Sequence, residues 1–473
     1  MPLEAASVPS SGPSPAAVAR PLGGDEFAAA MAACGPFETH PHIGVAVSGG
    51  RDSLALALLA AEWVGARAGR LTAFVVDHRL RPDSTAEAVT VAALLAGVGI
   101  ESEILPWIAA PPATGISEAA RQARYALLAE RCRALGILHL LLGHQRGDQA
   151  ETVLLRLADG SGPEGLAGMA AVVERDALRL LRPLLGVERP RLAATVAAAG
   201  LRWIDDPSNQ RREFSRVVAR QALDDARSDD LHALSGRFAT DRRSLDRRLA
   251  GLCVELVGVD PRGFATLARE AFFALPPSIA RRLLSRLAAT FGGRHYPARG
   301  AGLERALETL AAGRNAVAGG CRFLVRGAAI LVCREPGAIA GPVAVAKPGS
   351  MLWDYRYRID PPAGPGTTAI AALGEAGRRQ VLAQGAESLR EMPVSAAAAL
   401  PALYRDGVLA GLFLPGSRAP RAATAADLEG GRAASRPATV IFPADFRPAQ
   451  GLAAAPWGSD DVGTLVLPAG KPI

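Results

Sequence analysis

The sequence comprises 473 residues, more than one compact hydrophobic core normally supports, so we expect two or three domains. Hydrophobic residues make up 49% and charged residues 21%, and no apolar run reaches the roughly 18 residues of a membrane span. The net charge of +7 favours a polyanionic partner such as RNA. Arginine supplies all but two of the 53 basic residues, a bias that is also typical of GC-rich genomes.

The five cysteines lie far apart and form no CxxC pair, which argues against a zinc site, an iron–sulfur cluster and a disulfide framework. This usage fits a reducing cytosol. The first 22 residues are rich in Ala, Pro and Ser, and they lack the charged and apolar regions of a signal peptide. We therefore expect a disordered tail over residues 1–22 and a cytoplasmic protein with no membrane partner.

Short apolar runs alternate with helix-forming stretches in the first half of the chain. We expect strands at 43–47, 71–76, 101–105, 137–142 and 178–181, and helices at 54–63, 85–96, 117–135 and 148–158. Continuous apolar strands separated by helices predict a parallel sheet with helices on both faces. The fold class is therefore α/β, over a domain that spans residues 23–220.

The second half of the chain has a different character. Residues 221–315 show apolar residues at helical spacing, which predicts a helical connecting domain. Residues 316–473 are rich in Gly and Pro, with hairpin signals around Gly327 and at Asp406-Gly407 and a strand-like stretch at 352–357. We predict a small β-rich C-terminal domain with linkers.

The first chemical signal is the hexapeptide Ser48-Gly49-Gly50-Arg51-Asp52-Ser53, which lies between a predicted strand and a predicted helix. Glycines let the backbone approach a ligand closely, and the unpaired N–H groups of a helix start bind phosphate oxygens. Asp52 would repel a bare phosphate but suits a Mg²⁺ ion that bridges it to the phosphates. The alternative is a plain glycine turn with Asp as a helix cap; the strand–loop–helix context favours nucleotide binding.

The hexapeptide resembles the PP-loop of the ATP-pyrophosphatases, which cleave ATP to AMP and pyrophosphate. Further segments resemble the tRNA(Ile)-lysidine synthetase family: Val76–Pro82, Glu118–Tyr125, Gly143–Thr152, Gly165–Met169, Arg182–Leu185 and Asp206–Asn209, followed by Arg216 and Arg220. The resemblance covers residues 43–220. The chain departs from the family's pattern at Gly147, where an acidic or amide residue is usual, and at Val217.

The resemblance implies a ligase that uses ATP and Mg²⁺ to adenylate the C2 oxygen of cytidine 34 in the tRNA(Ile) anticodon. Lysine then attacks through its ε-amine, giving lysidine, AMP and pyrophosphate. It implies ATP binding by Ser48, Gly49, Gly50, Arg51, Asp52, Ser53, Asp77 and His78, with Asp52 on Mg²⁺, and catalytic roles for Asp52, His144 and Asp148. A homodimer is a further expectation.

Asp148 and Glu151 stand three residues apart and share one face of a predicted helix. The resemblance links this pair to recognition of the substrate lysine, whose ammonium group two carboxylates would suit. The alternative is an acidic first turn that complements the helix dipole.

Four arginines are the predicted contacts to tRNA or phosphate: Arg121, Arg124, Arg216 and Arg220. Arginine stripes suit a phosphate backbone. In so arginine-rich a chain, a solvated or salt-bridged helix face is the alternative.

Two rival functions share the same loop. A PP-loop tRNA thiolation enzyme needs a sulfur carrier, usually reactive cysteines near the loop, and Cys34 and Cys132 are isolated. A non-catalytic RNA-binding relative would have no need of Asp52, which is present.

Overall fold

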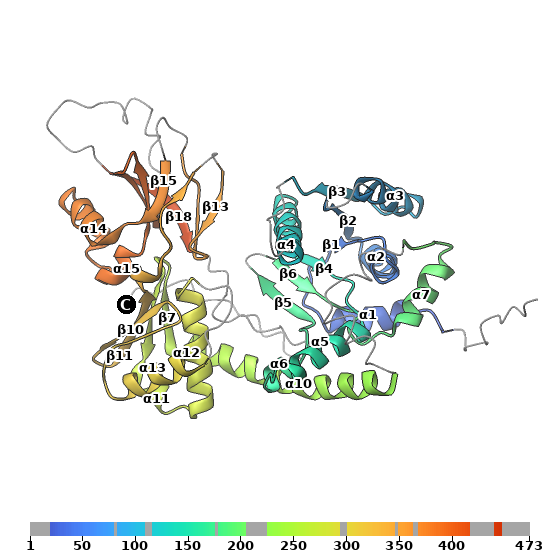
Figure 1. Cartoon of the computed structure of the whole chain (residues 1–473), viewed down its shortest axis with the longest axis horizontal. Coiled ribbons are helices and arrows are strands. Elements are labelled where there is room, and N and C mark those ends of the chain that lie inside the picture. Colours follow the sequence, from blue (N-terminus) through green and yellow to red (C-terminus); the bar gives the residue numbers. More distant parts are fainter. Residues whose placement is uncertain are drawn as a thin grey trace, which may run out of the picture. The chain divides into compact units, whose positions relative to one another are not determined.

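A computed structural model describes residues 19–79, 83–108, 116–175, 178–204, 225–293, 300–345, 349–362, 368–416 and 439–446 (Figure 1). The chain divides into two compact units. Of the described residues, the first unit contains those within 19–173 and 178–243, and the second contains 174–175 and those within 244–446. The predicted domain limits at 220 and 315 stay a prediction.

The first unit is built on a six-stranded sheet with the strand order β3-β2-β1-β4-β6-β5. Its strands are β1 (His42–Ala46), β2 (Arg70–Asp77), β3 (Ser102–Pro106), β4 (His139–Leu141), β5 (Val172–Arg175) and β6 (Leu178–Leu181). The neighbours among β3, β2, β1, β4 and β6 pair in parallel, which confirms the predicted α/β class. β5 was not predicted from the sequence.

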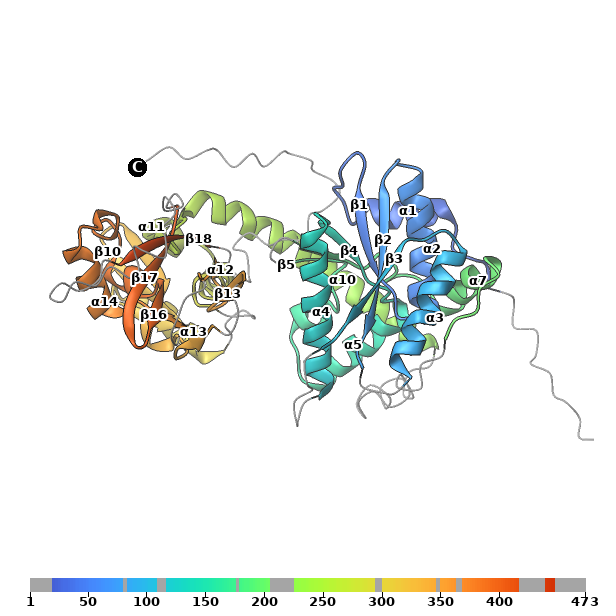
Figure 2. The same ribbon diagram turned by 90° about the horizontal axis from the view of Figure 1, so that it is seen from above.

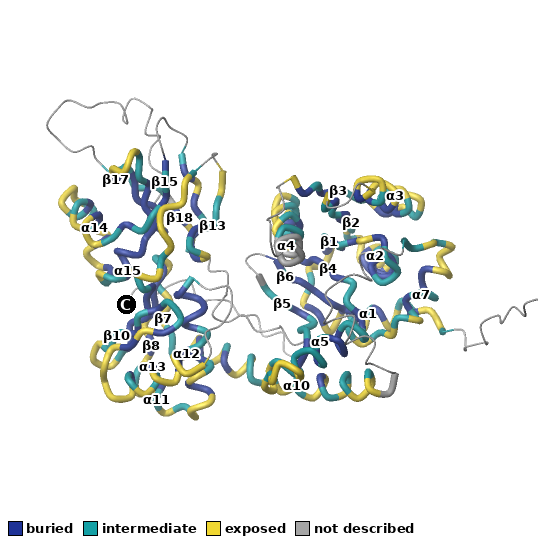
Figure 3. Tube along the Cα trace, viewed as in Figure 1, coloured by how far each residue is buried: buried dark blue, intermediate teal, exposed yellow. Residues whose placement is uncertain are grey.

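Helices cover both faces of this sheet (Figure 2). They are α1 (Gly24–Ala32), α2 (Arg51–Gly65), α3 (Ser84–Gly97), α4 (Ile116–Ala134), α5 (Arg146–Ala158), α6 (Pro163–Leu166) and α7 (Arg189–Ala198). A long helix, α10 (Asp225–Leu256), contains the boundary between the two units. In Figure 3 the strands are mostly buried, whereas α3 and α10 expose much of their outer surface.

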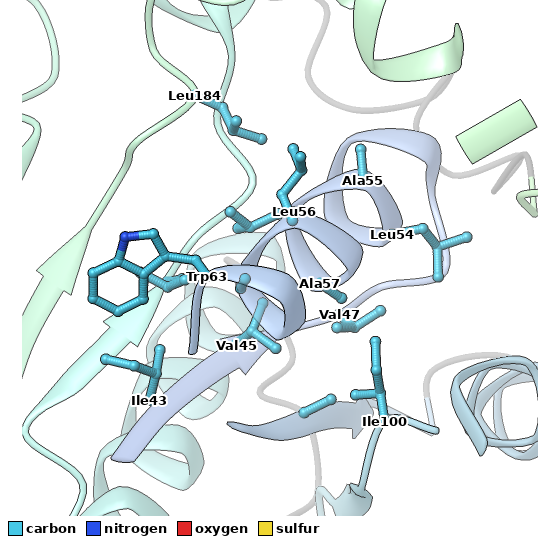
Figure 4. Packing of buried hydrophobic residues seen from close by; sticks show 14 of the residues in the cluster. Ile43, Val45, Val47, Leu54, Ala55, Leu56, Ala57, Trp63, Ile100 and Leu184 are labelled. Carbon is cyan, nitrogen blue, oxygen red and sulfur yellow. The ribbon is translucent and has the colours of Figure 1, made fainter. Parts of the chain in front are cut away.

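The period-two pattern of β1 explains how the two faces differ. Ile43 and Val45 are fully buried in the core that contains α1, α2, α3 and α7, and Figure 4 shows them beside the side chains of α2. Between them, Gly44 faces the other core, where a Cβ would lie 3.4 Å from Cys132 Sγ of α4 and only 2.9 Å from the Phe74 ring. Glycine here lets α4 pack closely on the sheet.

The strand order reverses between β1 and β4. The chain proceeds outward from β1 through β2 to β3, and then returns to place β4 on the other side of β1. Open parallel sheets bind ligands at the carboxyl ends of the two strands that flank such a reversal. The residues that follow β1 and β4 therefore converge at one point.

The second unit contains two antiparallel-rich sheets. The first, of order β7-β8-β11-β10-β9, has strands β7 (Val257–Asp260), β8 (Phe264–Ala268), β9 (Ala316–Ala318), β10 (Cys321–Arg326) and β11 (Ala329–Arg334). Its core includes residues of α11 (Arg269–Phe273), α12 (Pro277–Phe291) and α13 (Ala301–Ala311). The predicted hairpin around Gly327 is confirmed by the β10–β11 pairing.

The other sheet has seven strands in the order β12-β15-β16-β17-β18-β14-β13. They are β12 (Val343–Ala344), β13 (Met351–Trp353), β14 (Tyr357–Ile359), β15 (Thr368–Ala372), β16 (Pro401–Arg405), β17 (Val408–Pro415) and β18 (Val440–Phe446). The helices α14 (Gly374–Ala383) and α15 (Val394–Ala398) and the 3₁₀ turns η1 (Pro336–Ala338) and η2 (Glu387–Leu389) complete the unit. The turn predicted at Asp406-Gly407 joins β16 to β17.

Two sequence predictions need correction. Residues 257–268 lie in the segment predicted as helical but form the antiparallel pair β7–β8, because β8 finds a pairing partner in β11 that local periodicity does not reveal. The strand predicted through 352–357 is interrupted by a turn, in which Asp354 and Tyr355 have φ values of 49° and 53°. Asp354 there binds two buried arginines, Arg334 and Arg356.

The chain's N-terminal tail was predicted over residues 1–22. Residues 1–18 lie outside the described part, but Leu22 is buried and its N–H donates to Thr195 Oγ1 at 3.0 Å. Within the described ranges, no helix combines the length and the apolar character that a membrane span requires.

Candidate functional site

The predicted phosphate loop connects β1 directly to α2. Gly49 has φ +82°, and a Cβ there would lie 2.5 Å from Val91 Cγ2, so only glycine fits. Gly50 is the N-cap of α2, whose first-turn N–H groups have no acceptor within the helix. These donors, at the positive end of the helix dipole, form a surface that suits an anion.

The two serines of the loop hold its shape. The Ser53 hydroxyl donates to Gly50 O at 2.9 Å and accepts from the Ser48 N–H at 3.1 Å. The Ser48 hydroxyl lies 3.3 Å from that of Ser53. Ser53 is buried and Ser48 is exposed, so Ser53 closes the loop while Ser48 remains accessible to a ligand.

The segment after β4 packs on this loop. A Cβ at Gly143 would lie 3.1 Å from Ser53 Cα and 3.3 Å from the carbonyl carbon of Asp52. A larger residue would push β4 away from the start of α2, so glycine allows the two edges to meet. His144 follows Gly143 directly, and its N–H donates to Leu142 O at 2.9 Å. The structure therefore brings His144 to the edge of the phosphate loop.

The helix that starts after His144 presents two acidic side chains at the same edge. The Gln145 N–H donates to Asp148 Oδ2 at 3.0 Å, and the Gln145 side chain accepts from the Gly147 N–H. This capping arrangement fixes the first turn of α5 and the position of the Asp148 carboxylate. Glu151, one turn later, is only 6% exposed.

The carboxylates of this edge interact electrostatically. Burial raises the pKa of Asp148 from 3.8 to about 6, and the negative charges of Glu151 and Asp52 add to that rise. The Gln145 N–H and the positive charge of Arg189 act in the opposite direction. The loop acid and the α5 acids therefore belong to one site, which favours the binding of a cation.

Asp52 is 21% exposed and lies near two guanidinium groups. Arg51 Nε is 3.7 Å from Asp52 Oδ1, and Arg189 Nε is 3.8 Å from Asp52 Oδ2. Both distances exceed that of a good hydrogen bond. Arg51 also lies over the Trp203 ring, 5.8 Å from its centroid.

A magnesium ion at Asp52 would find few protein ligands. In the described part of the chain, no three His, Cys, Asp or Glu side chains come together in a way that could hold a metal. Mg²⁺ commonly uses only one or two carboxylates together with substrate phosphates and water. One acid beside a phosphate loop fits this pattern.

Asp77, at the end of β2, has its acceptors occupied within its own loop. It accepts hydrogen bonds from Ser84 Oγ at 2.5 Å, from Thr85 Oγ1 at 2.8 Å and from the N–H and Nε of Arg79. Against the effect of burial, these bonds hold the pKa of Asp77 below its usual value. Asp77 thus organises the β2–α3 connection, next to which His78 is half-buried.

The predicted basic contacts are only partly described. Arg216, Arg220 and the side chain of Arg121 lie outside the described residues, and so does the segment 205–224 that joins α7 to α10. Arg124 is half-buried on α4. Their predicted role at tRNA or phosphate stays a prediction.

Comparison with known proteins identifies the family of this site. The PP-loop domain model matches residues 25–226. A tRNA(Ile)-lysidine synthase from Ruegeria pomeroyi is 36% identical over 340 residues, which cover 71% of this chain and 80% of the relative. The one from Rhodopseudomonas palustris is 41% identical over 295 residues, which cover 60% of this chain and 85% of the relative.

The chain belongs to the tRNA(Ile)-lysidine synthase family. Among solved structures, a U34-tRNA thiolase with a [4Fe-4S] cluster from Methanococcus maripaludis matches with a TM-score of 0.40 and 15% identity. That match covers 46% of this chain and 78% of the thiolase, and it is too distant to carry an argument about chemistry.

Two segments that carry the resemblance to the synthase family are joined by hydrogen bonds. Gln149 Nε2 donates to Met169 O at 3.1 Å, and the Met169 N–H donates to Gln149 Oε1 at 2.8 Å. Arg156 Nη1 donates to the carbonyls of Gly165 and Gly168, each at 2.8 Å. The segment 165–169 is therefore fastened to α5, the helix that carries the predicted lysine-binding acids.

Gly147, one of the departures from the synthase family's pattern, has a structural role. A Cβ at this position would lie 3.2 Å from both Nε2 and Oε1 of Gln145. The Gln145 side chain folds back over this glycine to cap α5. A bulkier residue would displace the cap, so Gln145 and Gly147 form a matched pair.

Sequence reasoning missed Arg189, whose guanidinium lies at the phosphate loop, and Trp203, on which Arg51 stacks. Arg189 follows the predicted Arg182–Leu185 segment by four residues, and it could have been found by extending that segment to the start of α7.

Proposed function

We propose that this protein is an ATP-dependent ligase that makes lysidine at cytidine 34 of tRNA(Ile). It adenylates the C2 oxygen of the cytosine and then joins C2 to the ε-amine of lysine, releasing pyrophosphate and AMP. Membership of the tRNA(Ile)-lysidine synthase family supports the reaction. The observation that carries the proposal is the meeting of the phosphate loop with Asp148 and Glu151 at one edge of the sheet.

The chemistry explains why both halves of the site are needed. The cytosine C2 carbonyl is a poor electrophile and oxide is a poor leaving group. Transfer of AMP to the oxygen makes it a good leaving group, and the amine can then displace AMP. The catalytic contribution is chiefly positioning and the neutralisation of charge on the phosphates.

The loop residues would bind the ATP phosphates. The backbone of Gly49 and Gly50 and the hydroxyl of Ser48 would donate to them, with Arg51 adding charge and Ser53 holding the loop. Asp52 would hold Mg²⁺, which neutralises phosphate charge when bound. The carboxylate of Asp77 already accepts hydrogen bonds from Ser84 and Thr85. His78 is therefore the better candidate for contact with the nucleotide.

The other half of the site would bind lysine. Glu151 is buried and Asp148 is half-buried, and burial together with the neighbouring negative charges disfavours the ionisation of Asp148 until a cation joins the pair. The ε-ammonium of lysine supplies that cation. His144 follows Gly143, which packs against the loop, and we expect it to contact the base or the α-phosphate.

Thiolation is not favoured by the cysteines. All five are buried and none forms a disulfide, at positions 34, 132, 253, 321 and 333. Burial raises the pKa of Cys34 to about 11 and that of Cys132 to about 12, so neither forms a thiolate readily at neutral pH. A sulfur carrier would need an accessible thiolate.

The test is mass spectrometry of tRNA(Ile) nucleosides after incubation with the protein, ATP and lysine. We expect lysidine to replace cytidine 34, and we expect no product when lysine is omitted or when the transcript carries U34. Unmodified cytidine after incubation with a preparation that binds ATP would refute the assignment. A thiolated nucleoside would support the rival function instead.

A further inference from the structure

Arg189 lies beside the acidic side chains of the site. It belongs to none of the sequence motifs from which the site was predicted. It begins α7, and its Nε lies 3.8 Å from Asp52 Oδ2. The side chain is 33% exposed, whereas its Nε atom is buried and makes no hydrogen bond to any described residue. A buried N–H without an acceptor is costly, which suggests that its acceptor arrives with a ligand.

Comparison with other arginines shows that Arg189 is not built to pair with Asp52. Arg191 is two residues later on the same helix, and its Nη2 lies 2.7 Å from Glu26 Oε2. Arg146 lies 2.7 Å from Glu188 Oε1. These arginines make close hydrogen-bonded ion pairs, whereas the distance from Arg189 Nε to Asp52 Oδ2 is about 1 Å longer than theirs.

The charged groups that interact with Arg189 indicate its position within the site. It pairs loosely with Asp52 in the phosphate loop, and its positive charge also acts on Asp148. It is therefore near both the loop proposed to bind pyrophosphate and the acids proposed to bind lysine. The α-phosphate must lie between these two parts of the site, because it is joined to pyrophosphate before adenylation and to the base that lysine attacks afterwards.

We propose that Arg189 binds the α-phosphate of ATP and of the adenylated tRNA, an inference that rests on the proposed function. During adenylation the cytosine oxygen forms a bond to the α-phosphorus, the bond from that phosphorus to the bridging oxygen breaks, and pyrophosphate leaves with the electron pair. Arg189 takes no part in bond making or breaking; its N–H groups donate hydrogen bonds to the phosphate oxygens. Its planar guanidinium suits such bidentate contact.

Calorimetric binding of AMP, adenosine and pyrophosphate tests this contact without requiring turnover. AMP differs from adenosine only by the α-phosphate, and pyrophosphate represents the other two phosphates. In Arg189→Gln we expect the preference for AMP over adenosine to fall about 10-fold or more, with pyrophosphate binding within about twofold of wild type. Arg189→Lys should restore part of the preference, since it restores the charge.

The matched control is Arg191→Gln, which removes an arginine of the same helix that pairs with Glu26 and does not touch the site. It should retain the wild-type preference for AMP. An unchanged preference in Arg189→Gln, or an equal loss of pyrophosphate binding, would overturn the inference. If the wild-type protein makes no lysidine but Arg189→Gln still loses the AMP preference, the phosphate contact stands and only the proposed reaction fails.

Discussion

The most unusual residue of the site is Asp148, a carboxyl group held where its charge is unfavourable. Burial and two acidic neighbours raise its pKa to about 6, while the folded protein holds it in place through the Gln145 N–H. A raised carboxyl pKa means that the folded state binds the proton more tightly than the unfolded state does. Ionisation of Asp148 therefore reduces stability as the pH rises from about 4 to about 6.

Replacing Asp148 with Asn should consequently stabilise the fold at neutral pH. The variant keeps an oxygen acceptor for the Gln145 N–H but carries no charge. We expect a gain of about 1–3 kcal/mol in the free energy of unfolding at pH 7.5, and a gain smaller by about 1 kcal/mol at pH 5. Urea unfolding at the two pH values measures both quantities.

The control for this prediction is Asp159→Asn, which removes an exposed acid at the other end of α5. Its effect on stability should not change between the two pH values. A gain in Asp148→Asn that is independent of pH, or a loss at pH 7.5, would show that the carboxyl group is not held in an unfavourable environment.

At the scale of elements, α5 joins the parts of the site. Its first turn carries Asp148, Gly143, just before the helix, packs against the phosphate loop, and Gln149 binds the backbone of Met169 in both directions. Gln149 is only 5% exposed, so water cannot readily replace it. The amide thus fixes segment 165–169 relative to the helix.

Gln149→Ala should therefore destabilise the first unit by about 1–3 kcal/mol, because two backbone groups lose their partner where water has little access. Urea unfolding measures the change. Thr152→Ala is the control on the same helix, since its hydroxyl bonds only to the helix carbonyl of Asp148. If Gln149→Ala lost no more stability than Thr152→Ala, the bond to Met169 would contribute nothing.

The elements also show what a sequence can and cannot predict. The strands β1, β2, β4 and β6 were predicted because each lies in a largely apolar run, which is typical of strands buried on both faces. β3 was predicted as a short strand, although only Leu105 of it is buried. β7 and β8 were not, because β7 pairs with β8, and β8 in turn pairs with β11, whose residues lie more than sixty positions away. Periodicity carries no information about such a partner.

The same distinction holds for the site. The loop Ser48–Ser53 was predictable because its function depends on local geometry, and the hydrogen bonds between Ser48, Gly50 and Ser53 are made within six residues. Arg189 was not, since its role depends on the folding of α7 against α2, some 137 positions later than Asp52. Asp77 shows the converse: its place at a strand end was predictable, but its four internal hydrogen bonds were not.

At the scale of the whole molecule, the two units have separate hydrophobic cores. The clusters around Ile43 and Phe74 belong to the first unit, and those around Phe291 and Phe413 belong to the second. Every described residue of the candidate site lies in the first unit. We therefore expect the chemistry to be determined there, by two half-sites that follow β1 and β4 and that can be impaired one at a time.

The most direct measurement of this claim is mass spectrometry of the anticodon oligonucleotide after incubation of tRNA(Ile) with ATP and lysine. Asp52→Asn should form neither adenylated nor lysidine-containing RNA. Asp148→Asn should still adenylate cytidine 34 but form lysidine about 100-fold more slowly, because the ammonium group loses a charged partner. Full adenylation by Asp52→Asn, or normal lysidine formation by Asp148→Asn, would contradict the account.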